Sequence, residues 1–427
     1  MLNIIDQPRY KCALAAMQTI QSIPGAVPIL HSGPGCASKL NDNSGSGGHF
    51  APNAYPCSLV SEKEVVFGGI KKLRNTVENA LNVMDAQLFV VISGCTTEII
   101  GDDIQEVAED FFTIERPVIW AKTPGFKGNN YLGHDWILKS IFEQYLTKLE
   151  TKQKIKGLVN IFAGTPQQDP FWLGNLRELE KLIKSIGFIP NTIFGAGRSL
   201  ENIKKIRQAE YTILVSPWVG SESAEYLEKE FDIPLLKYPV LPIGAAETGK
   251  FLRAVGDFCN ADKEVVEKVI KEKEAEYYYF LERYADTLLE TGLLGKRFSI
   301  VSEAQYTLAI TKFLVNDLGK FPLTQFITDD TPEKYRNKIT EEFKKLNYDI
   351  SAEVEWSTDG NAIHKKIKAL DFEGIPLIIG SYWEKEIAKE IKGRYVNISY
   401  PIINRLVING SIAGYSGGLR LLEDIYS

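Results

Sequence analysis

The sequence predicts an α/β protein made of three doubly wound parallel-sheet domains. Short apolar runs of strand length alternate with amphipathic stretches of helical length along the whole chain. This alternation is typical of a parallel sheet that is covered by helices on both faces. A chain of 427 residues also exceeds the size at which a single hydrophobic core stops growing, so two or three domains are expected. We place the domains at residues 1–150, 151–260 and 261–427.

The first unit is predicted from helix and strand patterns that alternate up to residue 120. Apolar residues recur at helical spacing in one stretch, and a continuous apolar run after it indicates a buried strand. Good helix formers after Cys12, which end before a Pro-Gly pair, indicate a short helix. The expected elements are a helix at 12–20, a strand at 26–30, a helix at 70–84, a strand at 88–92, a helix at 96–112 and a strand at 117–120.

The same alternation restarts twice further along the chain. The second unit is expected to have strands at 157–163, 192–194, 211–215 and 233–236, and helices at 173–186, 200–209 and 224–230. A charged, tyrosine-containing helix from about 261 to 290 separates it from the third unit. The third unit is expected to have strands at 297–301, 322–327, 375–379 and 395–398.

Composition narrows the class of function. The net charge of −6 and the pI near 5.6 argue against a nucleic-acid partner. The N-terminus lacks a secretory pattern, and no apolar run approaches the roughly 20 residues that a membrane helix needs. We therefore expect a cytoplasmic protein without a membrane partner. In a reducing cytosol, five scattered cysteines indicate metal binding or redox chemistry more than disulfides.

Three of the five cysteines, Cys36, Cys57 and Cys95, lie in turn-like contexts within the first hundred residues. Cys36 and Cys95 follow buried strands, and the crevice at the carboxyl ends of strands is where open α/β sheets bind ligands. Soft thiolates select iron–sulfur clusters. Glycine and proline beside these cysteines favour close approach of the backbone to a bulky ligand. Because the spacing matches no compact metal motif, buried cysteines that act as small hydrophobic residues remain the alternative.

The other cysteines and the histidines are less informative. Cys12 is either a fourth ligand or a helix-packing residue, and Cys259, which has no glycine loop, is expected to be structural. His31 either forms a hydrogen bond near a cluster or is a satisfied structural residue. The remaining histidines form no pair at i, i+3 or i, i+4, which weakens a zinc or di-iron helix motif; they are His49, His134 and His364.

Nucleotide and acid–base motifs are weak. Gly195-Ala-Gly197 partly matches a dinucleotide fingerprint, but the third glycine is missing and the acidic residue is not well placed, so we interpret it as a turn into a helix. No P-loop pattern is present, and the chain is therefore not expected to hydrolyse ATP itself. The pair Asp102-Asp103 is interpreted as first-turn charge at a helix N-terminus, without an evident catalytic partner.

Several of these motifs together resemble the nitrogenase component 1 family, which also includes cofactor-assembly scaffolds and reductases of other substrates. The N-terminal motifs are His31-Ser-Gly-Pro-Gly-Cys36, Glu64-Val-Val-Phe-Gly-Gly69 and Ser93-Gly-Cys95-Thr-Thr-Glu-Ile-Ile-Gly-Asp-Asp103. The downstream motifs are Thr123-Pro-Gly-Phe-Lys-Gly128, Gly133-His-Asp135, Asp169-Pro-Phe-Trp-Leu-Gly174, Leu214-Val-Ser-Pro-Trp218 and Gly414-Tyr-Ser-Gly-Gly-Leu-Arg-Leu-Leu-Glu-Asp-Ile-Tyr426. The resemblance covers nearly the whole chain.

The resemblance implies three nitrogenase component 1-like domains and an iron–sulfur cluster shared with a homologous subunit. That cluster is of the [8Fe-7S] P-cluster type, with [4Fe-4S] as the alternative. Cys36 and Cys95 fall on the family's cluster-ligand positions, and Cys57 resembles the additional ligand of the β-type subunit. The context of Cys12 is closer to the first ligand of α-type chains. No cysteine follows Cys259, so a large iron–sulfur cofactor held by one cysteine and one histidine is not expected in this chain.

The resemblance therefore implies a β-type subunit of a nitrogenase-like reductase. An ATP-hydrolysing iron protein is expected to deliver electrons to the shared cluster, and through it to a site that reduces dinitrogen or another hard-to-reduce substrate. The partner is an α-type subunit in an α2β2 heterotetramer, or a second copy in a homodimer. The alternative is a scaffold for assembly of a nitrogenase-type cofactor. A third, simpler hypothesis is an α/β binding protein with incidental cysteines.

Overall fold

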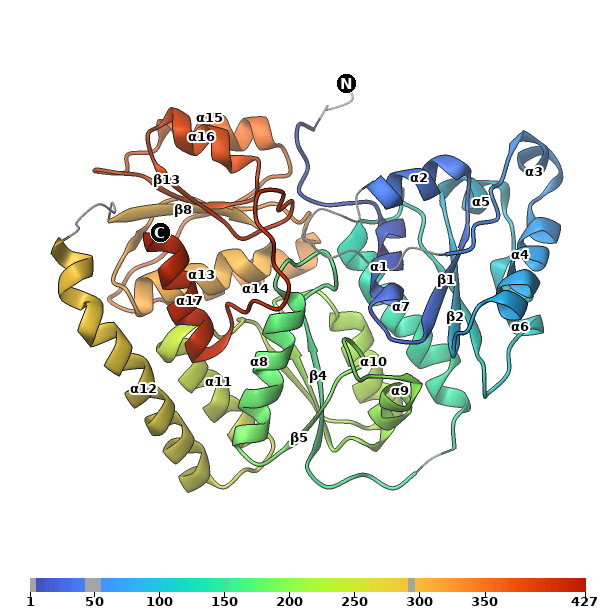
Figure 1. Ribbon diagram of the computed structural model, residues 1–427, viewed down its shortest axis with the longest axis horizontal. Helices are drawn as coiled ribbons and strands as arrows, with labels where there is room; N and C mark the ends of the chain where they lie inside the picture. Colours follow the sequence, from blue (N-terminus) through green and yellow to red (C-terminus); the bar gives the residue numbers. More distant parts are fainter. Residues whose placement is uncertain (1–4, 43–54, 151, 291–295) are drawn as a thin grey trace.

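The chain folds into three α/β units, each built on its own parallel sheet (Figure 1). The computed structural model describes residues 5–42, 55–150, 152–290 and 296–427. His49, one of the four histidines in the sequence, lies outside these residues. Every pair of strands within the three sheets runs parallel, so the predicted α/β class is confirmed. The boundaries at residues 150 and 260 stay a prediction.

The first sheet has the order β1-β2-β3 and helices on both of its faces. Residues of β2 alternate between two cores: Phe89 and Val91 pack with Val77 of α4 and Val107 of α6, whereas the next residues along the strand face the other core. The elements are β1 (Ala26–His31), β2 (Leu88–Ser93), β3 (Val118–Lys122), the 3₁₀ helix η1 (Ala13–Ala16), α1 (Met17–Gln21), α2 (Pro34–Asp42), α3 (Glu62–Phe67), α4 (Ile70–Val83), α5 (Cys95–Ile100), α6 (Ile104–Asp110), α7 (Asn130–Gln144) and η2 (Leu146–Lys148).

The single helix expected at 96–112 is wrong, because the structure divides it into α5 and α6. Gly101 ends α5 with a left-handed backbone, φ 80°, which favours glycine. Asp103 then begins α6, and its carboxylate accepts the backbone N–H groups of Gln105 and Glu106. Asp103 is therefore a helix cap, whereas Asp102 lies in the turn between the two helices.

The second sheet has the order β5-β4-β6-β7. Its elements are β4 (Leu158–Ala163), β5 (Ile189–Asn191), β6 (Tyr211–Val215), β7 (Leu235–Tyr238), α8 (Trp172–Ser185), α9 (Leu200–Lys205), η3 (Ile206–Gln208), α10 (Ser221–Phe231) and α11 (Gly244–Phe258). The strand expected at 192–194 is wrong: β5 lies three residues earlier, and Thr192 begins a turn in which its hydroxyl accepts the N–H of Phe194. Helix α11 was not predicted, because its glycines weaken the helical pattern.

The third sheet has the order β11-β10-β8-β12-β13, with β9 beside β8. Its elements are β8 (Arg297–Ser302), β9 (Phe321–Pro322), β10 (Gln325–Ile327), β11 (Val354–Trp356), β12 (Leu377–Gly380), β13 (Arg394–Asn397), α13 (Ala304–Asn316), α14 (Glu333–Glu342), α15 (Gly360–Ala369) and α16 (Glu384–Glu390). The long helix α12 (Lys263–Glu290) and the C-terminal helix α17 (Gly414–Tyr426) pack together against α11. The end of the chain thus returns to the central unit.

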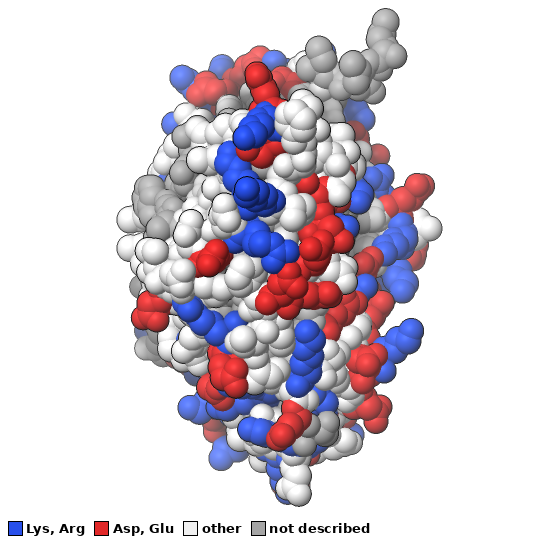
Figure 2. Space-filling view, turned by 90° about the vertical axis from the view of Figure 1, so that its right-hand side faces the viewer, with Lys and Arg blue, Asp and Glu red and all other residues white. Residues whose placement is uncertain are grey.

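The surface carries charges of both signs. Figure 2 shows basic and acidic side chains interspersed on the face of the molecule that carries the first unit. In that unit, Arg74 of α4 pairs with Glu106 and Asp110 of α6. Neither sign of charge dominates this face. Among the helices in the described ranges, none is both long and apolar enough to cross a membrane.

Candidate functional site

Four of the five cysteines lie on neighbouring segments at one end of the first sheet. Cys95 begins α5 directly after β2, and Cys36 is the third residue of α2, shortly after β1. The strands therefore pass into helices, rather than into the open loops that the sequence suggested. Cys57 pairs with Leu30 beside β1, and Cys12 lies immediately before η1.

Cys12 and Cys95 both lie beside Gly125, although 83 positions separate the two cysteines in the sequence. The N–H of Gly125 donates a hydrogen bond to Cys95 Sγ at 3.2 Å. A Cβ built on Gly125 would lie 3.6 Å from each of the two sulfurs and 2.9 Å from Cys12 Cβ. Because both sulfurs lie 3.6 Å from the same Cβ position, the distance between them is at most twice 3.6 Å. The absence of a side chain at Gly125 leaves open the space between them.

Backbone hydrogen bonds fix the segment that carries Cys12. Cys12 forms an antiparallel bridge with Asn129, the N–H of Ala13 donates to Gly128 O at 3.1 Å, and the N–H of Asn130 donates to Lys11 O at 2.9 Å. The N-terminal segment therefore runs along the loop that follows β3. This pairing places Cys12 at the site, which the sequence alone left open.

The segment that carries Cys57 runs beside β1 like a short extra strand. Leu30 N–H donates to Pro56 O at 2.8 Å, and Ser58 N–H donates to Leu30 O at 2.9 Å. The Cys57 sulfur accepts the N–H of Leu59 at 3.4 Å. Cys57 is thus held close to the end of β1, from which the chain continues to Cys36.

The thiols affect one another electrostatically, which indicates that they are close. Partial desolvation raises the pKa of Cys12, and the nearby Cys36 and Cys95 raise it further. Partial burial likewise raises the pKa of Cys57, against the opposing Leu59 N–H, and Cys36 raises it further. Cys36 therefore lies within electrostatic range of both Cys12 and Cys57. We call these four residues the thiol cluster: Cys12, Cys36, Cys57 and Cys95.

His31 connects the segments around the thiol cluster. Its side chain is fully buried, with Nδ1 at 2.8 Å from Ser58 Oγ and Nε2 at 2.9 Å from Asp102 Oδ2. Burial lowers the pKa of His31, partly offset by Asp102. Asp102 also accepts the N–H of Gly69. The interpretation of Asp102 as simple helix-terminal charge is therefore incomplete, because the carboxylate is a buried partner of His31.

Large apolar side chains are exposed next to the thiol cluster. Phe67 is 81% exposed on α3, and Ile99 is 74% exposed one turn after Cys95 on α5. Helices α3 and α5 contact each other. We call this set the apolar rim: Leu59, Val65, Val66, Phe67, Ile99 and Phe126. Exposed apolar residues on neighbouring segments of this kind indicate a candidate contact surface.

Other predicted candidates lie away from the thiol cluster. Cys259 is buried at the end of α11, where burial raises its pKa to about 12, as expected of a structural thiol. His134 is buried on α7 and pairs with Thr19 Oγ1 at 2.8 Å. His364 lies 3.2 Å from Glu384 in the third unit. Within the described parts of the chain, no group of three or more His, Cys, Asp or Glu side chains could hold a single metal ion.

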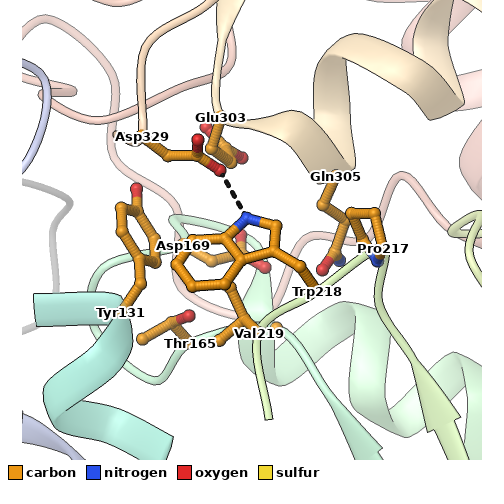
Figure 3. A pocket seen from close by; sticks show the side chains of 10 residues that line it. Tyr131, Thr165, Asp169, Pro217, Trp218, Val219, Glu303, Gln305 and Asp329 are labelled. Carbon is orange, nitrogen blue, oxygen red and sulfur yellow. Dashed lines mark hydrogen bonds between the residues drawn. The ribbon is translucent and has the colours of Figure 1, made fainter. Parts of the chain in front are cut away.

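A second candidate site is a small cavity where the three units meet (Figure 3). It has a volume of about 20 Å³. Figure 3 shows Tyr131 of α7, Trp218 after β6, and Glu303 and Asp329 after β8 and β10 around it. The indole N–H of Trp218 donates to Asp329 Oδ2 at 3.0 Å. The cavity thus lies at the carboxyl ends of strands from two sheets, and its size suits about one water molecule.

Two carboxyl groups that line this cavity have raised pKa values. Burial raises the pKa of Asp169 to about 7, against hydrogen bonds from the Tyr306 hydroxyl and the Phe171 N–H. Burial, followed by the charge of Asp169, raises the pKa of Glu303 to about 8. Among the described residues, Asp169 Oδ2 is buried and has no hydrogen-bond partner. Asp169 and Trp218 belong to two of the family motifs in the sequence, and no local pattern predicts that they meet.

Three helix-covered parallel sheets place this chain among the doubly wound α/β proteins. The sequence model of the nitrogenase component 1 type oxidoreductases matches residues 12–427. The chain therefore belongs to the nitrogenase component 1 family, and the family predicted from the sequence motifs is confirmed.

Similar proteins agree with this assignment. The nitrogenase molybdenum-iron protein beta chain of Crocosphaera subtropica is 24% identical, with 96% of this chain and 81% of the relative aligned. The protein of the same name from Clostridium pasteurianum is 24% identical, with 96% and 90% aligned. The solved structure "Nitrogenase Cp1 at pH 6.5" matches with a TM-score of 0.82 at 21% identity, covering 100% of this chain and 93% of that chain. The structural match supports the fold.

Proposed function

We propose that this chain is the β-type subunit of a nitrogenase-like reductase. In this proposal the thiol cluster holds an iron–sulfur cluster at the interface with a homologous α-type subunit. Electrons reach that site from an ATP-hydrolysing iron protein and continue to a substrate-reducing site held mainly by the partner. The observation that carries the proposal is the convergence of four thiols from segments far apart in the sequence.

The residues around the thiols suit an iron–sulfur cluster. Thiolates are the usual ligands of such clusters, and this chain supplies four of them at one end of the first sheet. Gly125 leaves open the space that a side chain would fill between two of the sulfurs. When bound, the cluster supplies one-electron redox chemistry. The chain's own contributions are sulfur ligation, backbone donors such as Gly125 N–H, and partial burial, all of which affect the reduction potential.

The exposure of this region supports a partner subunit. Cys12 is exposed, and Cys36, Cys57 and Cys95 are only half-buried. Water reaches a cluster in such a position unless another chain covers it. The apolar rim beside the thiols offers a surface for that contact, since the buried core of a protein interface is more apolar than the rest of the surface and is enriched in aromatic side chains. The relatives named beta chains of the molybdenum-iron protein support a homologous α-type subunit as the occupant.

The small cavity supports placing the redox site at the thiols. Of the residues that the structure describes, those that line the cavity include no cysteine and no histidine, and a volume of about 20 Å³ is far too small for a polynuclear metal cofactor. In the proposed assembly this chain therefore relays electrons, and the reduction of substrate takes place in the partner.

The test is purification of the chain together with its coexpressed partner under anaerobic conditions. We expect iron and acid-labile sulfide in the complex, and ATP-dependent reduction of a small substrate after addition of the iron protein. Cys95→Ala should lose the cluster's visible absorption, because it removes the sulfur that Gly125 fixes. Cys259→Ala, which removes a buried thiol far from the site, should retain it. A wild-type complex without iron would overturn the proposal.

The same preparation separates the alternatives. Cofactor transfer to an acceptor protein without ATP-dependent reduction would favour the assembly scaffold. Iron and sulfide contents distinguish an [8Fe-7S] cluster, shared by the two subunits, from a [4Fe-4S] cluster. Cys12→Ser tests the fourth thiol: we expect a changed cluster spectrum, since the sulfur lies at the same gap as Cys95.

A further inference from the structure

We propose that His31 is a positioning residue for the cluster site, because it joins the segments that carry Cys57 and Cys95 to the end of β1. This inference rests on the proposed function, since it assigns His31 a part in cluster binding. His31 is not itself a ligand in this proposal: both of its ring nitrogens already have partners in the protein.

The backbone of His31 holds the start of α5. Its carbonyl oxygen accepts the Gly94 N–H at 2.9 Å and the Thr97 hydroxyl at 2.8 Å. Cys95 lies between these two donors. A Cβ on Gly94 would lie 2.2 Å from Ser32 Oγ, so the approach of α5 to the end of β1 requires glycine. The position of the Cys95 sulfur therefore depends on the backbone of His31.

The imidazole of His31 joins two further segments. Asp102 is acceptor-only as a carboxylate, and it already accepts the Gly69 N–H. The His31 Nε2 therefore carries the ring proton and donates it to Asp102, which leaves Nδ1 to accept from the Ser58 hydroxyl. Ser58 directly follows Cys57, and Asp102 directly follows the turn that ends α5. One side chain thus bridges the Cys57 segment and the far end of the helix that Cys95 begins.

The side chains of His31 and Asp102 also contact the segment that follows Phe67 of the apolar rim. Gly69 follows Phe67 by two residues, and a Cβ on Gly69 would lie 2.6 Å from Asp102 Oδ2 and 3.0 Å from His31 Cε1. The carboxylate and the imidazole therefore fill the space against the Gly69 backbone. Two hydrogen bonds thus connect the Phe67 segment to His31, because the Gly69 N–H and His31 Nε2 both pair with the Asp102 carboxylate.

The order Ser58–His31–Asp102 resembles a hydrolytic triad, but the burial argues against that chemistry. Ser58 is 2% exposed and His31 is 0% exposed, so no substrate carbonyl reaches the hydroxyl. A nucleophilic serine must be accessible and must face donors for the developing oxyanion. In this enclosed position the three groups act through the segments that they connect.

The test compares variants of the complex purified with its partner. His31→Ala removes both side-chain bonds, whereas His31→Gln keeps an N–H near the Nε2 position and loses the acceptor for Ser58. Ser58→Ala removes that same bond from the other side. His134→Gln is the matched control, because His134 is also buried in the first unit and pairs with the Thr19 hydroxyl. The readouts are the rate of iron loss to a chelator, the EPR spectrum of the cluster and its midpoint potential.

We expect His31→Ala to lose iron about tenfold faster than wild type and to change the EPR spectrum, because buried groups are left unpaired. His31→Gln and Ser58→Ala should share a smaller change, and His134→Gln should match wild type. Unchanged spectrum, potential and iron loss in all His31 and Ser58 variants would overturn the inference, as would equal changes in His134→Gln. A wild-type complex that contains no iron would instead overturn the proposed function.

Discussion

Asp169→Asn should have a higher free energy of unfolding than the wild-type protein at alkaline pH. Asp169 is 7% exposed, and its Oδ1 accepts the Phe171 N–H at 2.8 Å and the Tyr306 hydroxyl. Its Oδ2 has no hydrogen-bond partner in the part of the chain that the structure describes. An asparagine whose oxygen takes the Oδ1 position keeps both hydrogen bonds. Its amide then replaces the unpartnered oxygen beside Glu303, and the buried charge is removed.

The size of the effect follows from the pKa of Asp169, which burial raises to about 7. An unfolded aspartate has a pKa of about 3.9, so the folded chain binds more protons than the unfolded chain between these values. Raising the pH through this window therefore destabilises the fold, and above about 7 the penalty is constant. At about 1.4 kcal/mol per pH unit, the free energy of unfolding falls by about 2 kcal/mol between pH 5.5 and pH 7 through this group alone.

Urea denaturation at about pH 5.5 and pH 8.5 measures this difference. We expect the wild-type free energy of unfolding to fall by about 2 kcal/mol more than that of Asp169→Asn. Asp169→Ala is the contrasting variant, because it removes the acceptor for Tyr306 and should be destabilised at both pH values. An Asp169→Asn protein that loses the same stability as wild type over this range would refute the reasoning.

Three further changes test other parts of the molecule. Phe67→Asp should lower ATP-dependent electron delivery by about tenfold or more, because it removes an exposed aromatic side chain from the proposed interface. Val83→Asp, at an equally exposed position at the end of α4, should leave electron delivery unchanged. Neither variant should change the unfolding midpoint of the subunit. Arg9→Ala should cost about 3 kcal/mol in urea denaturation, because it leaves the fully buried Glu384 carboxylate without its guanidinium; no loss would contradict this. Gly125→Ala should lower the iron content of the complex, because its methyl group would lie against two of the sulfurs; full iron content would show that the gap is not needed.

Local sequence patterns were enough to predict the class of fold and most of its strands. The apolar run at 88–92 became β2, and its alternating residues pack in two cores, as a strand covered on both faces must. One error occurred where a single residue decides the backbone. Gly101 divides the expected helix at 96–112, because its left-handed backbone ends α5 and allows Asp103 to begin α6.

Part of the candidate site was also predictable. Cysteines after buried strands predicted ligands at the carboxyl end of the first sheet, and Cys36 and Cys95 lie there. The approach of Cys12 was not predictable, since it depends on pairing between the N-terminal segment and Asn129. The partners of His31 belong to three separate segments, and no periodic pattern in the sequence encodes such a meeting.

The sequence by itself determined the alternation of helices and strands, the family motifs and the supply of thiols. Tertiary structure alone decided which thiols meet, which histidine joins their segments and how little space remains at the junction of the three units. The physical reason is range. Periodicity and turn chemistry act over a few residues, whereas the gap at Gly125 and the bonds of His31 depend on groups that only the packed sheet brings together.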